Sequence, residues 1–382
     1  MGTNYDSCVS KLLTGVSPDT LTLSYDIPVT DPFTRLEDAR ELLEGGRPDR
    51  ARALLRGAFP RELAAESRLL RGEALRHQGY FGRSIVEYRA ALKACAGGDA
   101  DIASAAWLGL ARSARSLGDT AAARRALASA RRVKGADRET LALEDALVLR
   151  ADSKHRAALK ALAPMLRSAR RRRDAAAEGF LLWAIAGSRR FSGDLAGSHA
   201  DFKASLAAFK RAKDAEGEAY ALFGLGGIAR VRGLFAEARR AYAEAGKRLG
   251  SGPDLFGRAY AHCGLANCLR QLGLLDEAER NYRKSYALYA GLDDRVDLAF
   301  VDWGMGQIHQ RRGELAPAER RYRAALAAFA GGAEDRGLVL ARKSLAEVLH
   351  ARGRTREAEK LFDSAVALAR RSGLTAHLEP YT

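Results

Sequence analysis

An arginine recurs at one position of a repeating pattern in this 382-residue chain. It stands three residues before a predicted turn in six successive units, and glutamine and then histidine replace it in the next two. The position is occupied by Arg76, Arg115, Arg150, Arg190, Arg230, Arg270, Gln310 and His350. A guanidinium group offers a planar fork of N–H donors that suits carboxylates, phosphates and peptide carbonyls. The series, called here the arginine ladder, predicts repeated anion-binding groups along one face of the molecule.

Aromatic and amide side chains accompany the ladder in units five to eight. They lie thirteen, ten and six residues before the turn, which puts them on the same helix face as the arginines. The aromatic residues are Phe180, Trp183, Tyr220, Phe223, Tyr260, Phe300 and Trp303, and the amides are Asn267 and Gln307. Apolar walls with a few polar groups are typical of a binding pocket, and an amide can grip a peptide backbone through both donor and acceptor.

Two structural explanations stay open beside the binding interpretation. An arginine near the end of a helix also complements the negative helix C-terminus, and aromatic residues on this face can simply fill a tightly wound interior.

The elements that position these residues follow from a period of 40 residues. Five turn glycines keep this spacing without a slip: Gly193, Gly233, Gly273, Gly313 and Gly353. Each is preceded and followed by an alanine-rich stretch of strong helix formers. A small residue recurs seven residues before the turn and another five after it, and a large apolar residue follows four positions later, as in Gly226, Ala238 and Tyr242. The pattern predicts interlocking helix pairs in a repeat array.

These columns resemble the tetratricopeptide repeat (TPR). Leu225-Gly226, Met305-Gly306 and Leu265-Ala266 match its Leu-Gly pair, and Trp107 matches its first-helix tryptophan. The 40-residue period looks like the long-repeat branch of kinesin light chains, Pins-type adaptors and Rap-type and MalT-type regulators. The resemblance implies an all-α, right-handed superhelical solenoid of about nine helix–turn–helix units, whose concave groove carries the ladder face. Relatives commonly use Asn and Arg there for carboxylates and extended peptides.

The expected organisation is a central array between two short segments. Residues 1–32 are acidic and alternate in hydropathy, which predicts a non-helical strap; residues 33–371 form the array, and residues 372–382 a tail. The expected units are 33–59, 60–97, 99–134, 137–173, 174–213, 214–252, 254–293, 294–333 and 334–371. The unit at Ser153 lacks the turn glycine. We keep as hypotheses that the strap docks in the groove of its own or a neighbouring copy, and that the uncapped solenoid end forms a homodimer.

Charge and composition restrict the partners. The net charge of +16 favours anionic partners, and the basic run Arg167–Arg173 keeps nucleic acid binding as an alternative, although a solvated helix end explains that run as well. The sequence has no apolar stretch of transmembrane length and no secretory pattern, so a cytoplasmic protein with reduced cysteines is expected, and the composition hints at a bacterial source.

Signatures of catalysis are missing from the sequence. It contains no phosphate-binding GxxxxGK[ST] loop, no HExxH and no paired-cysteine zinc pattern, and Gly224–Ala229 imitates a dinucleotide fingerprint only inside a predicted helix. We therefore expect no catalytic residue, metal or cofactor. The predicted function is a non-enzymatic scaffold or adaptor that binds an acidic or extended peptide in the groove. The alternatives are a regulator that senses a small molecule or peptide, and a nucleic acid binder.

Overall fold

The computed structural model describes residues 31–95, 98–292, 294–332, 334–372 and 374, and within them the only regular elements are helices. A 3-10 turn (Arg61–Leu63) accompanies eighteen α-helices. They are α2 (Pro32–Glu44), α3 (Pro48–Leu54), α4 (Ala64–His77), α5 (Phe81–Ala94), α6 (Ala100–Ser116), α7 (Thr120–Ala130), α8 (Arg138–Ala151), α9 (His155–Arg171), α10 (Ala175–Phe191), α11 (Leu195–Ala212), α12 (Ala215–Val231), α13 (Phe235–Leu249), α14 (Leu255–Gln271), α15 (Leu275–Leu292), α16 (Arg295–Arg311), α17 (Leu315–Gly331), α18 (Asp335–Ala351) and α19 (Thr355–Arg371).

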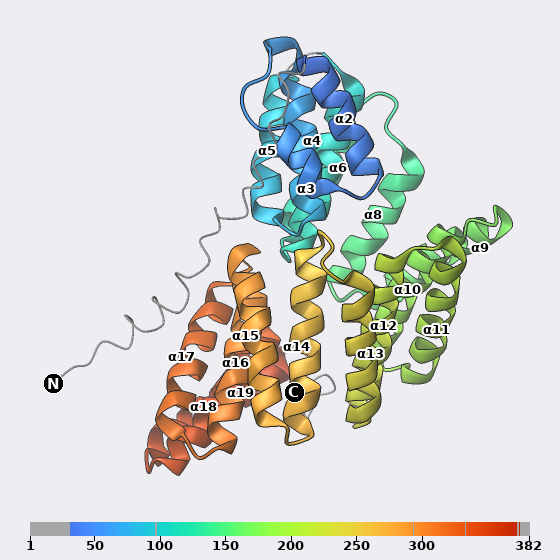
Figure 1. The fold of residues 1–382 in the computed structure, drawn as a ribbon. Helices are drawn as coiled ribbons and strands as arrows, with labels where there is room; N and C mark the ends of the chain where they lie inside the picture. The colour runs from blue at the N-terminus through green and yellow to red at the C-terminus, as the bar shows by residue number, and fades with distance from the viewer. Residues whose placement is uncertain (1–30, 96–97, 293, 333, 373, 375–382) are drawn as a thin grey trace.

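The helices pack in sequence order as a curved series of pairs (Figure 1). The all-α solenoid of stacked helix pairs is thereby confirmed, and the hand of its superhelix stays a prediction. The proposed strap lies outside the described residues except for Asp31 and Pro32: Asp31 is non-helical and caps α2, and α2 begins at Pro32, one residue before the predicted start of the array. Within the described residues, no helix is both long and apolar enough to cross a lipid bilayer.

Turns and caps give each pair its local geometry. The turn glycines adopt a positive φ, for example +88° at Gly193, a conformation in which other residues are strained. Ser153 takes this role in the fourth unit with a φ of 59°. An aspartate precedes the first helix of units three to eight and accepts backbone N–H bonds there, which offsets the unpaired donors of the helix start. These caps are Asp99, Asp137, Asp174, Asp214, Asp254 and Asp294.

The small and large columns interlock as the repeat predicts. Tyr242 of α13 is almost fully buried and lies between glycines of two successive first helices. A Cβ at Gly226 would lie 2.9 Å from the Tyr242 ring, and a Cβ at Gly264 would lie 2.2 Å from it. Glycine is therefore required at these positions by close packing between units and not by backbone conformation.

Changing Gly264 to alanine should destabilise the protein by about 1–3 kcal/mol, because the buried Tyr242 ring has no room to retreat. Gly246→Ala in α13 is the matched control, since its Cβ would meet only Ala261 at an ordinary 3.6 Å. The control should be neutral or stabilising by up to about 1 kcal/mol, because alanine favours the helix. Urea denaturation of both variants measures the difference, and equal stabilities would refute the interlock.

The array also curves far enough to bring distant units together. The rings of Phe81, which begins α5, and Phe256, in the first turn of α14, lie 5.9 Å apart in an edge-to-face contact. In Figure 1 the upper end of α14 lies beneath the block formed by α2 to α6. Units two and seven consequently meet, so the concave side is not an open groove along its whole length.

Candidate functional site

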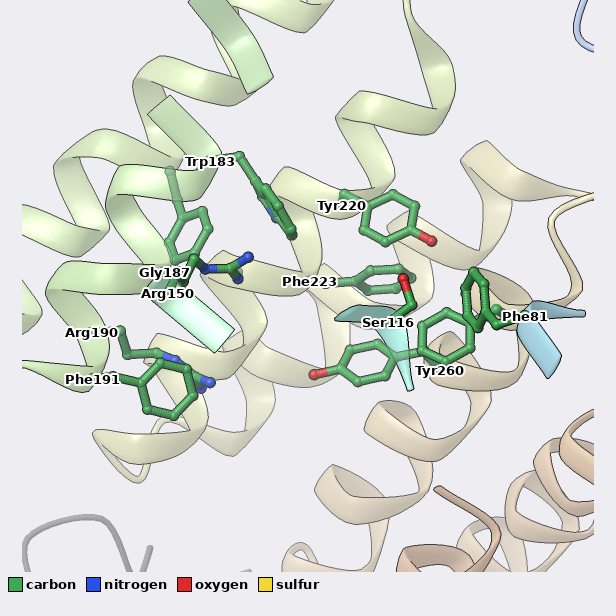
Figure 2. Close-up of a pocket in the computed structure, with 13 residues that line it drawn as sticks. Phe81, Ser116, Arg150, Trp183, Gly187, Arg190, Phe191, Tyr220, Phe223 and Tyr260 are labelled. Atoms are coloured by element: carbon green, nitrogen blue, oxygen red, sulfur yellow. The ribbon is translucent and has the colours of Figure 1, made fainter. Parts of the chain in front are cut away.

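A cavity of about 450 Å³ lies on the concave side, next to the place where units two and seven meet. Residues of α6, α8, α10, α12 and α14, the first helices of units three to seven, line most of it, with contributions from α5 and α11. Its walls are mainly aromatic, and the rings belong to Phe81, Trp183, Phe191, Phe202, Tyr220, Phe223, Phe256 and Tyr260. Figure 2 shows the guanidinium groups of Arg150 and Arg190 on one side and the rings of Tyr220, Phe223 and Tyr260 on the other.

Edge-to-face contacts hold the aromatic wall in place. The ring of Tyr220 lies 6.2 Å from Trp183 and 5.5 Å from Phe223, and Phe223 lies 5.0 Å from Tyr260. The Tyr220 hydroxyl donates a 3.0 Å hydrogen bond to Asp254, the buried cap of α14. Because each ring is restrained by the next, the wall is preorganised to receive an apolar group.

Arg150 contributes to this cavity a guanidinium group whose hydrogen-bond donors are not all paired. Its guanidinium carbon lies 4.4 Å from the centre of the Trp183 ring. Its Nε is buried and has no hydrogen-bond partner among the described residues. Burial, with the positive charges of Arg115 and Arg190, lowers the pKa of Arg150 to about 10. A buried N–H of a charged group without an acceptor is unfavourable, so this geometry suits an anionic ligand.

Glycines make room for the guanidinium groups of Arg150 and Arg190, and the cavity lining contributes no acidic side chain. A Cβ at Gly187 would lie 2.9 Å from Nη2 of Arg150, and one at Gly227 would lie 3.1 Å from Nη1 of Arg190. A glycine on the first helix of the following unit, α10 for Arg150 and α12 for Arg190, therefore lets each guanidinium pass close to the backbone. None of the described residues that line the cavity is an aspartate or glutamate. The cavity consequently combines positive charge with apolar walls.

Arg76 and Arg115 have carboxylate partners within the chain, although Nε of Arg76, like that of Arg150, is buried without a hydrogen-bond partner among the described residues. Arg76 forms a 2.6 Å ion pair with Glu73, and Arg115 pairs with the buried Glu144 of α8. Neither arginine lines the cavity.

Arg270 does not face the groove as predicted. It is fully buried, donates hydrogen bonds to Gln307 and Tyr282, and lies over the ring of Trp303. Tyr282 also donates to Asn267 at 2.7 Å. The expected groove amides therefore belong in part to a network within the wall, because helices α14 and α16 supply Arg270 with acceptors.

The remaining predicted residues are distributed along the array. Arg230, Asn267, Phe300 and Trp303 line a second cavity of about 120 Å³, which Tyr260 also borders. Phe180 lines a third, larger cavity together with Trp183 and Tyr220.

Six predicted residues line none of these three cavities: Arg76, Arg115, Arg270, Gln307, Gln310 and His350. Gln310 accepts a hydrogen bond from Tyr322 and donates one to Glu347, and His350 is exposed on α18. No group of three or more His, Cys, Asp or Glu suited to a metal ion occurs in the described ranges.

Sequence reasoning missed the residues that close the cavity. Phe81 and Phe256 lie at helix starts, outside the aligned ladder face, and Ser116 ends α6. Only one signal in the sequence points to Phe81. The turn of unit two is followed by Tyr80 and Phe81, whereas the equivalent turns of units three and five are followed by a capping aspartate.

A solved structure shares this architecture. The apo form of the quorum sensor NprR from B. thuringiensis is 14% identical, with 88% of this chain and 98% of NprR covered and a TM-score of 0.58. At this identity the likeness to NprR concerns the fold alone. BtubC (BKLC) from P. vanneervenii is 20% identical, with 56% of this chain and 91% of BtubC covered and a TM-score of 0.47. Among proteins with curated descriptions, none matches the sequence.

Family models identify the repeat at both ends of the array. Two models described as tetratricopeptide repeat match residues 36–100 and 257–331. Their matches contain α4 with α5, and α15 with α16, and the described chain between them continues the same series of helix pairs. The resemblance to the tetratricopeptide repeat found in the sequence columns is thus confirmed over these two stretches, and the helix pairs between them have the same arrangement.

Proposed function

We propose that this protein is a non-enzymatic binding protein that takes an anionic segment of a peptide or partner protein onto its concave side. The aromatic cavity anchors the segment, with Arg150 and Arg190 on its carboxylate and the rings of Trp183, Tyr220 and Phe223 on a neighbouring apolar side chain. The observation that carries the proposal is the buried Nε of Arg150, which has no acceptor among the described residues.

Charge and volume support this choice of ligand. A carboxylate placed near Arg150 would satisfy its unpaired donor and offset the repulsion from Arg115 and Arg190. The volume of about 450 Å³ lies within the ordinary range for ligand pockets and holds only a few amino-acid side chains. A longer partner would therefore place a short anchor in the cavity and continue outside it.

A second candidate function is the sensing of a short peptide or small anionic molecule. It is favoured by the limited size of the cavity, which Phe81 and Phe256 border where units two and seven meet. The same residues serve both functions, and the length of the ligand distinguishes them.

Nucleic acid binding receives less support: in the basic run, Arg170 pairs with Glu178 and Arg172 with Glu139.

The binding proposal predicts a selective loss in the Arg150→Gln variant. A screen of fluorescent pentapeptides with Glu, Asp, Gln or Asn at the central position should yield binders enriched in Glu and Asp. For the tightest of them, Arg150→Gln should weaken binding about tenfold or more, as expected for the loss of a charge-assisted hydrogen bond. Fluorescence anisotropy provides the dissociation constants.

Arg232→Gln is the matched control, because it removes the same charge from an exposed residue next to the turn after α12. It should change the affinity less than twofold at physiological salt. Equal losses in the two variants would indicate general charge attraction, and a set of binders without acidic enrichment would refute the proposal.

A further inference from the structure

The contact between units two and seven is an addition to the ordinary packing of a repeat array. In such arrays each unit contacts its neighbours. Here Tyr80 packs against the apolar core that includes Tyr289 and Leu292 of α15, and Phe81 meets Phe256 of α14. These two places are separated along the chain by helices α6 to α13. The contact therefore closes a ring of units around the concave side.

Gly79 marks the place where the two units meet. A Cβ added to it would lie 2.9 Å from Cβ of Phe256 and 3.5 Å from both methyl groups of Leu292. The turn glycines of other units have the same left-handed backbone but nothing within 4 Å of an added Cβ. They are Gly118, Gly193, Gly233, Gly273, Gly313 and Gly353. Gly79 is thus required both by its conformation, with a φ of +89°, and by a close approach to another unit.

The closed ring and the anion cavity share their walls. Phe81 and Phe256 form the contact and also border the cavity that contains Arg150. A ligand in the cavity touches both sides of the contact, so it binds the closed ring better than an open one. A ligand shifts a conformational equilibrium toward the state that it binds more tightly.

The connection between units three and four offers a place to bend. Residues 131–137, between α7 and α8, contain no helix, whereas α11 and α12 are separated only by Lys213 and Asp214. Such a segment can absorb the backbone changes of an opening motion while the helix pairs on either side stay intact.

We propose that the contact of Gly79, Tyr80 and Phe81 with Phe256 and Leu292 is a latch that couples closure of the ring to ligand binding. The ligand in this inference is the one given by the proposed function, whereas the closed state is the contact between units two and seven. Occupancy of the cavity strengthens the latch, and loss of the latch weakens binding. The protein thereby converts binding at Arg150 into a change in the relative position of units two and seven.

The test compares Gly79→Ala with Gly118→Ala. Both variants place alanine in a left-handed turn, with a φ of +89° at Gly79 and +79° at Gly118, but only the first inserts a methyl group into the latch. Small-angle X-ray scattering of the full chain measures the radius of gyration without ligand, and anisotropy measures affinity for the tightest acidic pentapeptide. We expect a larger radius of gyration and an affinity five- to tenfold lower for Gly79→Ala alone. Saturating peptide should return its radius toward that of the unchanged protein.

Tyr80→Ala provides a second variant if Gly79→Ala does not fold, as judged by circular dichroism, and it should open the ring in the same way. Equal radii for the Gly79 and Gly118 variants would overturn the latch. A larger radius with unchanged affinity would overturn its coupling to binding. If no pentapeptide binds, the proposed function fails, and the radii of the ligand-free variants still decide whether the latch exists.

Discussion

Replacing Arg150 with methionine should make the ligand-free protein more stable and should abolish binding of acidic peptides. The guanidinium has a buried Nε without an acceptor and lies near Arg115 and Arg190, which together with burial lowers its pKa to about 10. Below about pH 10 the arginine is still charged in the folded protein, and this buried charge destabilises the fold relative to the unfolded chain. Methionine keeps an apolar contact with Trp183 and removes the buried charge. Replacing buried charges by apolar residues stabilises proteins by about 1–4 kcal/mol, and we expect a gain of about 1–3 kcal/mol.

Denaturation in urea at neutral pH, with and without the pentapeptide, measures both effects. Arg232→Met is the control, since it removes an exposed charge and should change stability by less than about 0.5 kcal/mol. A gain in stability together with a loss of binding would be typical of a site that maintains an unfavourable charge for its ligand. Destabilisation by Arg150→Met would instead show that the arginine is structural.

Much of the fold could be predicted because its determinants repeat within one or two helices. The positive φ of a turn glycine is a local requirement, and Ser153 shows that the turn persists where another residue stands. The alternation of small and large residues likewise depends only on neighbouring helices, as Tyr242 between Gly226 and Gly264 demonstrates. The closed ring is different. It results from small rotations summed over several units, and a single unit does not encode their total.

The ladder arginines have different hydrogen-bond partners, because the first helix of the following unit presents a different residue to each of them. Glu144 of α8 pairs with Arg115, and Gln307 of α16 accepts from Arg270. The first helix of the unit after Arg150, α10, presents Gly187 close to the guanidinium, and a glycine has no side-chain acceptor. The sequence contained this distinction, but it becomes visible only when each arginine is compared with the unit that follows it.

Asp297 should make the stability of this protein fall as the pH rises. Its carboxyl borders the second cavity, where burial, together with the negative charges of Asp294 and Glu334, raises its pKa to about 8. A hydrogen bond with Tyr289 opposes this shift only in part. In the unfolded chain an aspartate has a pKa of about 3.9. Between about pH 4 and pH 8 the unfolded chain therefore loses this proton while the folded protein retains it, and the free energy of unfolding decreases.

Asp297→Asn should remove this contribution, because the amide stays neutral and can still hydrogen-bond. We expect the variant to be more stable than the unchanged protein by about 2–4 kcal/mol at pH 8 and nearly equal to it at pH 4, with the gap widening in between. Urea denaturation at several pH values measures the gap, and other titrating groups cancel in the comparison. Asp363→Asn, at an exposed position on α19, should show no such trend. A constant gap at all pH values would mean that Asp297 is already ionised in the folded protein, so its negative charge would face Arg230 and Arg336 in the second cavity.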